Sequence, residues 1–319
     1  MKLQTQIPLQ KQSENLIDYN SNIFLLGSCF VENIGEKLEY FKFQNLINPL
    51  GILFHPLAVE SLISKAILKK EFTEKDIFFH NEQWHSFDAH SKLSSVSKVN
   101  LLNNLNKAIK ATNQQLHKST HIVITLGTAW IYKHIEKNNI VANCHKVPQK
   151  NFEKMLLSVE EITNSLNSII ALIKKVNHHT SIIFTLSPVR HLKDGFVENT
   201  QSKAHLITAI QSVLSTQEQS RSLFYFPSYE IMMDELRDYR FYNEDMIHPN
   251  ATAINFIWER FQEVWISASA QKTMDDIKEI QKGMLHKPFN SNSERYQEFL
   301  QKLEAKKNLL KSKFSHIQF

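Results

Sequence analysis

Glycine is scarce in this sequence. Six glycines occur in 319 residues, whereas average usage of about 7% would give about 22. A chain this sparing of glycine is expected to keep it where the backbone needs a positive φ or where another group approaches closely. Gly27 and Gly127 end apolar runs, and Gly51 lies just after one. The ends of these runs are therefore the first places to expect a functional site.

Cysteine, long apolar runs and blocks of like charge are also rare. The two cysteines, Cys29 and Cys144, do not make a disulfide framework. No run approaches the roughly 18 apolar residues of a membrane span, and the first residues show no signal-peptide core. The net charge is +5 and its basic residues are dispersed, so we expect no nucleic-acid partner. These absences predict a soluble, cytoplasmic protein.

Short apolar runs alternate with helical patterns over most of the chain. Strands are expected at 23–26, 44–47, 121–126, 181–186 and 223–226. The segment 70–95 is expected to be an irregular insertion or a small hairpin, and 130–147 another hairpin. Such alternation favours a parallel sheet covered by helices on both faces. We therefore predict a flavodoxin-like three-layer α/β/α domain with inserted hairpins.

The character of the sequence changes near residue 272. Two charged amphipathic helices are expected there, joined by a polar segment at 288–292. We predict a catalytic domain over residues 1–270 and a helical extension over 271–319. The extension either packs on its own domain or mediates dimerisation, so both a monomer and a homodimer are open.

Potential nucleophiles follow the first apolar run directly. The run Ile23–Leu26 stops at Gly27-Ser28-Cys29, and the later strands end at Gly127-Thr128 and Ser187-Pro188. In parallel sheets, sites lie outside the carboxyl ends of the strands. These segments are therefore expected to meet at one edge of the sheet.

An acid and a base occur together late in the chain, at Asp245 and His248. This spacing puts both side chains on one face of a turn or short helix. Asp245 could then orient the imidazole, while the free nitrogen of His248 takes a proton from Ser28 or Cys29. The sequence thus supplies the parts of acyl-transfer chemistry, if this loop reaches the same edge of the sheet.

The combined pattern resembles a known family. The segment 27–31 is similar to the motif for which the GSCFA family is named, and the order of glycine-ended strands before Asp-x-x-His-Pro resembles the SGNH (GDSL-type) hydrolase superfamily. Other segments similar to the GSCFA family are 48–52, 127–130, 143–146, 187–191 and 238–242. The resemblance covers about residues 22–265 and implies a hydrolase or acyltransferase acting on an ester.

The resemblance also implies roles for individual residues. The superfamily pattern Gly-Asp-Ser places the nucleophile where this chain has Cys29, with Ser28 in the Asp position. A thiol is therefore favoured as nucleophile, although a shift of one residue would make it Ser28. Backbone N–H groups at Cys29 and Gly51 would bind the oxyanion.

One block departs from the superfamily pattern. Gly127-Thr128 stands at the start of a block that usually reads Gly-x-Asn-Asp, so the usual Asn is missing. Thr128 or Asn143 could supply the missing donor. Asn143 and His145 belong to a polar cluster that either folds over the site or forms an ordinary hairpin tip.

The expected partner is a small-molecule or carbohydrate ester, and no cofactor or metal is required. A zinc site from Cys29, Cys144, His145 and His248 lacks the close spacing of structural zinc ligands. Two other readings stay open. One is a non-catalytic ligand-binding module on the same scaffold. The other is a redox-sensing dithiol, which requires the Cα atoms of the two cysteines to lie within about 7 Å.

Overall fold

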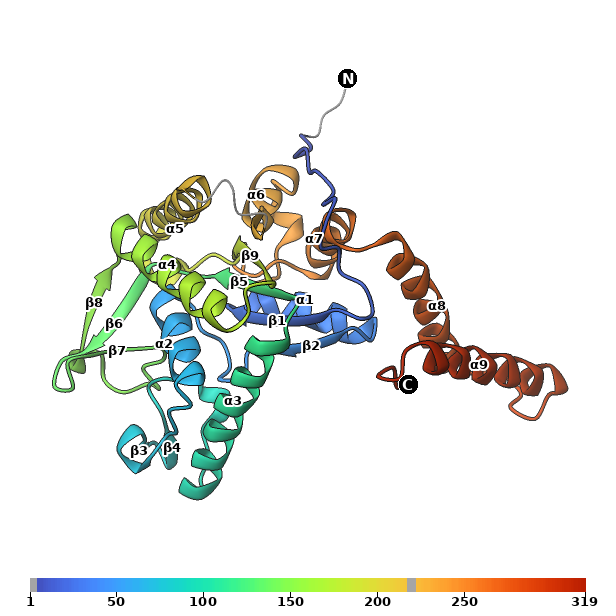
Figure 1. Ribbon diagram of the computed structural model, residues 1–319, viewed down its shortest axis with the longest axis horizontal. Coiled ribbons are helices and arrows are strands. Elements are labelled where there is room, and N and C mark those ends of the chain that lie inside the picture. The colour runs from blue at the N-terminus through green and yellow to red at the C-terminus, as the bar shows by residue number, and fades with distance from the viewer. Residues whose placement is uncertain (1–4, 217–221) are drawn as a thin grey trace.

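A five-stranded parallel sheet forms the centre of the molecule (Figure 1). The computed structural model describes residues 5–216 and 222–319; residues 1–4, part of the segment without a signal-peptide pattern, lie outside the described residues. The strand order is β10-β9-β5-β1-β2. When the five strands are numbered in chain order and the sheet is read from β2 to β10, this is the flavodoxin-like order 2-1-3-4-5. The predicted fold is confirmed. The strands are β1 (Asn22–Gly27), β2 (Gln44–Ile47), β5 (His121–Leu126), β9 (Ser181–Leu186) and β10 (Leu223–Phe226).

The sheet is buried on both faces, which explains its nearly continuous apolar strands. In β1, Phe24 and Leu26 point into one hydrophobic cluster, whereas Ile23 and Leu25 belong to the cluster on the opposite face. This alternation is the two-residue period of a strand. All six residues of β5 and of β9 are buried.

Helices cover the two faces (Figure 1). The hydrophobic cluster that contains Phe24 and Leu26 is covered by α2, α3, α4 and α5. The cluster on the opposite face, which contains Ile23 and Leu25, is covered by α1 and α7. A short helix, α6 (Ser228–Glu230), continues into a π-helical turn at Ile231–Glu235. The longer helices are α1 (Cys29–Tyr40), α2 (Pro56–Ile67), α3 (Lys98–Lys118), α4 (Val159–Val176), α5 (Phe196–Thr216) and α7 (Ala251–Trp265).

Two small antiparallel sheets are inserted into this framework. One is the hairpin of β3 (Phe78–His80) and β4 (Gln83–His85), and the other joins β6 (Trp130–His134), β7 (Asn139–Val141) and β8 (Phe152–Leu156) in the order β7-β6-β8. The sequence predicts both hairpins but not β8. Three consecutive residues of β8 are exposed, so this strand lacks the alternating pattern that would have marked it.

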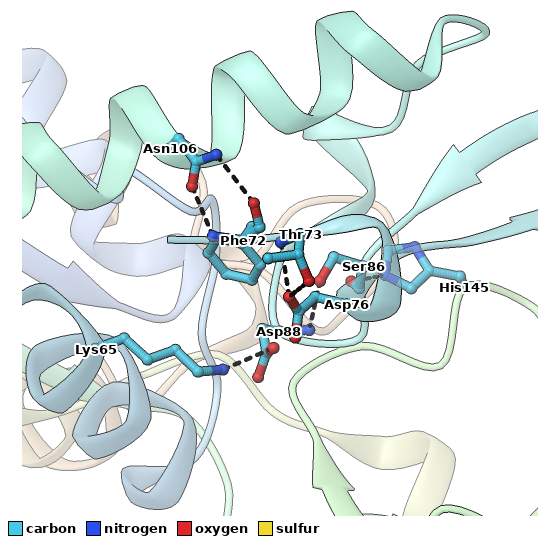
Figure 2. A network of polar contacts seen from close by, with 8 residues as sticks. All are labelled: Lys65, Phe72, Thr73, Asp76, Ser86, Asp88, Asn106 and His145. Carbon is cyan, nitrogen blue, oxygen red and sulfur yellow. Dashed lines mark hydrogen bonds and ion pairs between the residues drawn. The ribbon is translucent and has the colours of Figure 1, made fainter. Parts of the chain in front are cut away.

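The first insertion is fastened to the helices beside it (Figure 2). Lys65 of α2 forms an ion pair of 2.7 Å with Asp88. Asn106 of α3 accepts a hydrogen bond from the N–H of Phe72 at 2.7 Å and donates one to its carbonyl at 3.1 Å. The inserted segment is therefore held at both ends against the main domain.

The C-terminal helices project to one side of the molecule (Figure 1). They are α8 (Ala268–Leu285) and α9 (Glu294–Lys313). Met274 and Ile277 of α8 and Leu310 of α9 are buried in the cluster that also contains α1 and α7. Within the described residues, none of the helices combines the length and the apolar character needed to cross a membrane.

Candidate functional site

The end of β1 presents Ser28 and Cys29 in very different surroundings. Ser28 occupies the N-cap position of α1 but makes no capping hydrogen bond through its side chain. It is 0% exposed, and its Oγ has no hydrogen-bond partner among the described residues. Its N–H donates to the carbonyl of Thr125 at 2.9 Å. Cys29 is the first residue of α1 and is partly exposed. Of these two residues, Cys29 is the one with surface exposed to solvent.

Several groups act on the thiol of Cys29. Burial and the carboxylate of Glu32 raise its pKa, whereas Lys203 and the N–H groups of Cys29 and Phe30 lower it. The pKa is raised overall, so a thiolate at this position needs a base or additional positive charge to form.

Gly27 allows the chain to turn from β1 into α1. Its φ is +128°, and a Cβ at this position would lie 2.0 Å from the carbonyl oxygen of Thr125. Its N–H donates to Oδ1 of Asn48 at 2.9 Å. The Nδ2 group of Asn48 is buried and has no partner among the described residues. Gly51 donates its own N–H to the carbonyl of Asn48 at 2.7 Å, so this N–H is engaged within a turn.

Asp245 and His248 form a hydrogen-bonded pair. Nδ1 of His248 lies 2.6 Å from Oδ2 of Asp245, while Oδ1 accepts the N–H groups of Ile247 at 2.9 Å and His248 at 3.0 Å. The backbone N–H and imidazole of His248 lower the pKa of Asp245 to about 2. The carboxylate is therefore ionised near neutral pH and fixes the ring through Nδ1, which leaves Nε2 to act as a base.

Arg190 attaches this late loop to the loop that follows β9. Its N–H donates to the carbonyl of Ile247 at 3.3 Å, and its guanidinium donates to the carbonyl of Met246. The guanidinium also lies over the rings of Tyr242 and Tyr239, at 4.5 and 5.6 Å from their centroids. The Asp245–His248 segment is thereby held at the carboxyl edge of the sheet.

His191 lies between the late loop and the end of β1. A Cβ built on Gly127 would lie 3.2 Å from Nε2 of His191 and 3.2 Å from Cβ of Ser28. Burial, helped by the charges of Lys203 and His248, lowers the pKa of His191 to about 3. His191 is therefore a neutral imidazole near neutral pH, and its buried Nε2 has no partner among the described residues.

A buried lysine completes the cluster. Nζ of Lys203 donates to the carbonyls of Gly127 at 2.8 Å and Ser187 at 2.7 Å. From the sequence, His191 and Lys203 are expected only to be basic residues at or near the sheet edge, where they could bind a carboxylate or phosphate of a substrate. Their burial beside the candidate nucleophile depends on contacts across the fold, which no local pattern signals.

Thr128 already has two hydrogen-bond partners. Its Oγ1 lies 3.0 Å from Oγ of Ser202 and accepts the N–H of Trp130 at 3.0 Å. Thr128 thus fixes the turn from β5 into β6 against α5. Either hydroxyl can be the donor in the contact with Ser202, and Thr128 keeps a proton for an oxyanion only where Ser202 is that donor.

His145 lies beside Ser86 of the first insertion (Figure 2), and Asn143 is bonded to the backbone of His145. Nε2 of His145 donates to the carbonyl of Ser86 at 2.7 Å, and Oδ1 of Asn143 accepts the N–H of His145 at 2.8 Å. None of the hydrogen bonds recorded in residues 5–216 and 222–319 joins either residue to Cys29 or His248. The structure thus joins these two residues to each other and to the segment around Ser86, and their place in the site stays a prediction.

Both cysteines are free thiols. Cys29 packs with the cluster that contains α1 and α7, and Cys144 with a small cluster around Phe87 and Phe152. In the part of the chain that the structure describes, no three His, Cys, Asp or Glu side chains form a group that could hold a metal ion.

Comparisons with known proteins identify the family. The GSCFA family model matches residues 22–261, and a model described as the C-terminal domain of GSCFA domain proteins matches residues 277–319. No curated protein gives a significant match.

Solved structures resemble the chain weakly. A carbohydrate esterase family 3 protein from Talaromyces cellulolyticus is 10% identical with a TM-score of 0.35, and the alignment covers 81% of this chain and 99% of that one. An acetyl xylan esterase from the rumen bacterium Butyrivibrio proteoclasticus is 8% identical with a TM-score of 0.37, with 77% and 63% covered. Similarities this weak do not indicate which reaction this chain catalyses. The family model, by contrast, extends from β1 into α7, and the chain belongs to the GSCFA family.

Proposed function

We propose that this protein is an ester-processing enzyme, a hydrolase or acyltransferase, in which Cys29 is the nucleophile, His248 the base and Asp245 the residue that orients the base. The observation that carries the proposal is the 2.6 Å contact between Asp245 and Nδ1 of His248. That pair lies on a loop tied by Arg190 to the carboxyl edge of the sheet, the edge at which β1 delivers Cys29.

The choice of Cys29 over Ser28 rests on exposure. A substrate carbonyl must approach the nucleophilic atom, and Ser28 is 0% exposed whereas Cys29 is partly exposed. The N-terminus of α1 supports the same choice, because the N–H groups of Cys29 and Phe30 lie close enough to Sγ to lower its pKa. A thiol is also intrinsically the better nucleophile of the two.

The proposed reaction has two steps. His248 takes the proton of the Cys29 thiol, the sulfur attacks the ester carbonyl carbon, and the alcohol leaves with that proton as a thioester forms. His248 then deprotonates water, or an acceptor hydroxyl, which attacks the thioester and releases an acid or a new ester. The sulfur regains the proton as the thioester bond breaks, so the enzyme returns to its starting state.

The oxyanion would be bound by backbone groups at the start of α1. We propose the N–H groups of Cys29 and Phe30 for this role, because both act on Sγ. Gly51, the second donor expected from the sequence, would contribute only if its turn with Asn48 opened. The buried, unpartnered Nδ2 of Asn48, next to Gly27, is a further candidate donor.

Ester turnover tests the proposal directly. The full chain is assayed with p-nitrophenyl acetate and with acetylated oligosaccharides, and the acyl-enzyme is sought by mass spectrometry. We expect Cys29→Ala and His248→Ala each to lower kcat/KM by about a hundredfold or more. Ser28→Ala should stay within about tenfold of the parent, and Cys144→Ala serves as the matched control. Full turnover in Cys29→Ala would refute the thiol mechanism.

A non-catalytic binding module is the second candidate. It is favoured by the raised pKa of Cys29 and by the existing hydrogen bonds of Thr128 and Gly51. Under this alternative, the parent protein turns over none of the esters but binds acetylated oligosaccharides in calorimetry. Formation of an acyl-enzyme would exclude it.

A further inference from the structure

Lys203 is an unusual lysine because it is almost completely buried. It lies on α5 and is 2% exposed. Its Nζ donates to the carbonyl of Gly127, just past the end of β5, and to that of Ser187, just past the end of β9. An ammonium group has three protons to donate, and these two carbonyls take two of them. The amine is thus anchored at the same sheet edge as Cys29.

Within the described part of the chain, no carboxylate forms an ion pair with this amine. None of the ion pairs formed among the described residues includes Lys203. The aromatic ring of Tyr229, with its centroid 5.5 Å from Nζ, is a weaker partner. A buried cation without a counter-charge is costly. A nearby group that becomes negatively charged would stabilise the ammonium form of this lysine.

Cys29 supplies a group at the same sheet edge that can become negative. Nζ of Lys203 is bonded to the carbonyl of Gly127, and Gly127 lies against Ser28, the residue that precedes Cys29. Burial lowers the pKa of Lys203 to about 7, and Cys29 opposes this shift. Reciprocally, Lys203 opposes the rise that burial and Glu32 impose on Cys29. The other charged or titratable groups that act on either partner are the imidazole of His191, beside Lys203, and the amide dipoles at the start of α1, beside Cys29.

We propose that Lys203 is a positioning residue for the nucleophile, whose ammonium group, anchored on the carbonyls of Gly127 and Ser187, stabilises the thiolate form of Cys29. This inference rests on the proposed function in taking Cys29 as the nucleophile. In the proposed reaction His248 takes the thiol proton, and the ammonium group of Lys203 stabilises the thiolate that this transfer leaves. Attack by sulfur uses this thiolate, and departure of the acyl group restores it.

A purely structural role is the alternative, since Lys203 also ties the ends of β5 and β9 together. Lys174 offers a matched control for that role. Its Nζ donates to the carbonyl of Thr180 at 2.6 Å and to Oγ of Ser222 at 2.7 Å. Thr180 directly precedes β9 and Ser222 directly precedes β10, so Lys174 makes a similar tie at the amino edge of the sheet.

Thiol reactivity tests the proposal without requiring turnover. In the full chain carrying Cys144→Ala, Cys29 is the single thiol, and its alkylation by iodoacetamide is followed by mass spectrometry from pH 6 to pH 10. We expect Lys203→Met and Lys203→Gln to slow alkylation at pH 7.5 by about tenfold and to shift the pH profile upward by about one unit. Lys203→Arg should keep the rate within about threefold, and Lys174→Met should leave the profile unchanged.

A reciprocal measurement leaves Lys203 in place, so it does not depend on the folding of the Lys203 variants. In Cys29→Ala, the Nζ of Lys203 should titrate at a lower pH than in the parent, as followed by NMR of labelled lysine, because the thiolate no longer favours the ammonium form. Superimposable alkylation profiles of Lys203→Gln and parent, or a Lys203 titration unchanged by Cys29→Ala, would overturn the proposal. If only ester turnover is missing, the proposed function fails and the Lys203–Cys29 coupling still stands.

Discussion

His55 should make the stability of this protein depend on acid pH. The side chain is 3% exposed and caps α2, where Nδ1 accepts the N–H of Ala58 at 3.1 Å. Nε2 lies 3.2 Å from the carbonyl of Val141, to which it donates. Both nitrogens are therefore used by one neutral tautomer. A proton added to Nδ1 would point at the N–H of Ala58 and break the cap.

The size of the effect follows from the change in pKa on folding. Burial lowers the pKa of His55 to about 4, whereas histidine in an unfolded chain has a pKa of about 6.5. The unfolded state therefore binds more protons below neutral pH. The contribution of His55 to stability is complete above about pH 6.5 and is lost as the pH falls towards 4. Between pH 7 and pH 5 the loss is about 2 kcal/mol.

Urea unfolding at pH 7 and pH 5 measures this loss. His55→Asn keeps a capping acceptor but cannot titrate in this range. The variant loses the contact with Val141, which costs about 1 kcal/mol at both pH values. Other groups also titrate, so the informative quantity is the difference between the two proteins. The parent should lose about 2 kcal/mol more than His55→Asn over this interval.

His179→Asn, on the exposed surface, is the matched control and should follow the parent. Equal losses in the parent and in His55→Asn would refute the reasoning. The result also bears on the candidate site, because the segment that ends at His55 supports it. The N–H of Leu53 donates to the carbonyl of Gly27 at 2.9 Å, and the carbonyl of Phe54 accepts the N–H of Gly127 at 2.8 Å.

Three further predictions concern the orienting acid, the first turn and the C-terminal helices. Asp245→Asn should lower kcat/KM on an aryl ester by about a hundredfold or more while the melting temperature stays close to that of the parent, because the pair is half-exposed; an active variant would exclude the orienting role. Gly27→Ala should yield little folded protein, as seen by circular dichroism, since its Cβ would overlap the carbonyl of Thr125; a native melting curve would contradict this. We propose that residues 271–319 are a separate helical extension. Their removal should lower the free energy of unfolding by several kcal/mol in urea titrations, because buried residues such as Met274 and Ile277 are lost. Light scattering of the full and the shortened chain tests whether the extension carries a dimer contact.

The central sheet could be predicted because its signals are local. The apolar runs of β1, β5 and β9 are each buried on both faces, and such runs between helical patterns are typical of a parallel sheet. The expectation that Gly27 is needed by the backbone is also confirmed, since it has a φ of +128° at the turn into α1. Strand β8 was missed because its residues are mostly exposed and its pairing is with β6.

The candidate site was only partly predictable. The Asp245–His248 contact lies within one turn, so spacing alone indicated it. The surroundings of Cys29 depend on side chains far away in the sequence, such as Lys203, and spacing cannot place these. The hydrogen bond between Thr128 and Ser202 could not be predicted for the same reason, since 74 residues separate the two. The roles assigned to Ser28, Cys29 and Gly51 stay predictions for the assays above.

The anchoring of the late loop has a consequence for how such an enzyme could be tuned. His248 is held by Arg190, which comes from the loop after β9, whereas Cys29 is carried by α1. The proposed base and the proposed nucleophile therefore lie on separate elements. Small shifts of the β9 loop would change the distance between them without altering either residue. If the proposed roles hold, variation in residues 188–195 is a way to adjust the rate of proton transfer while both residues are kept.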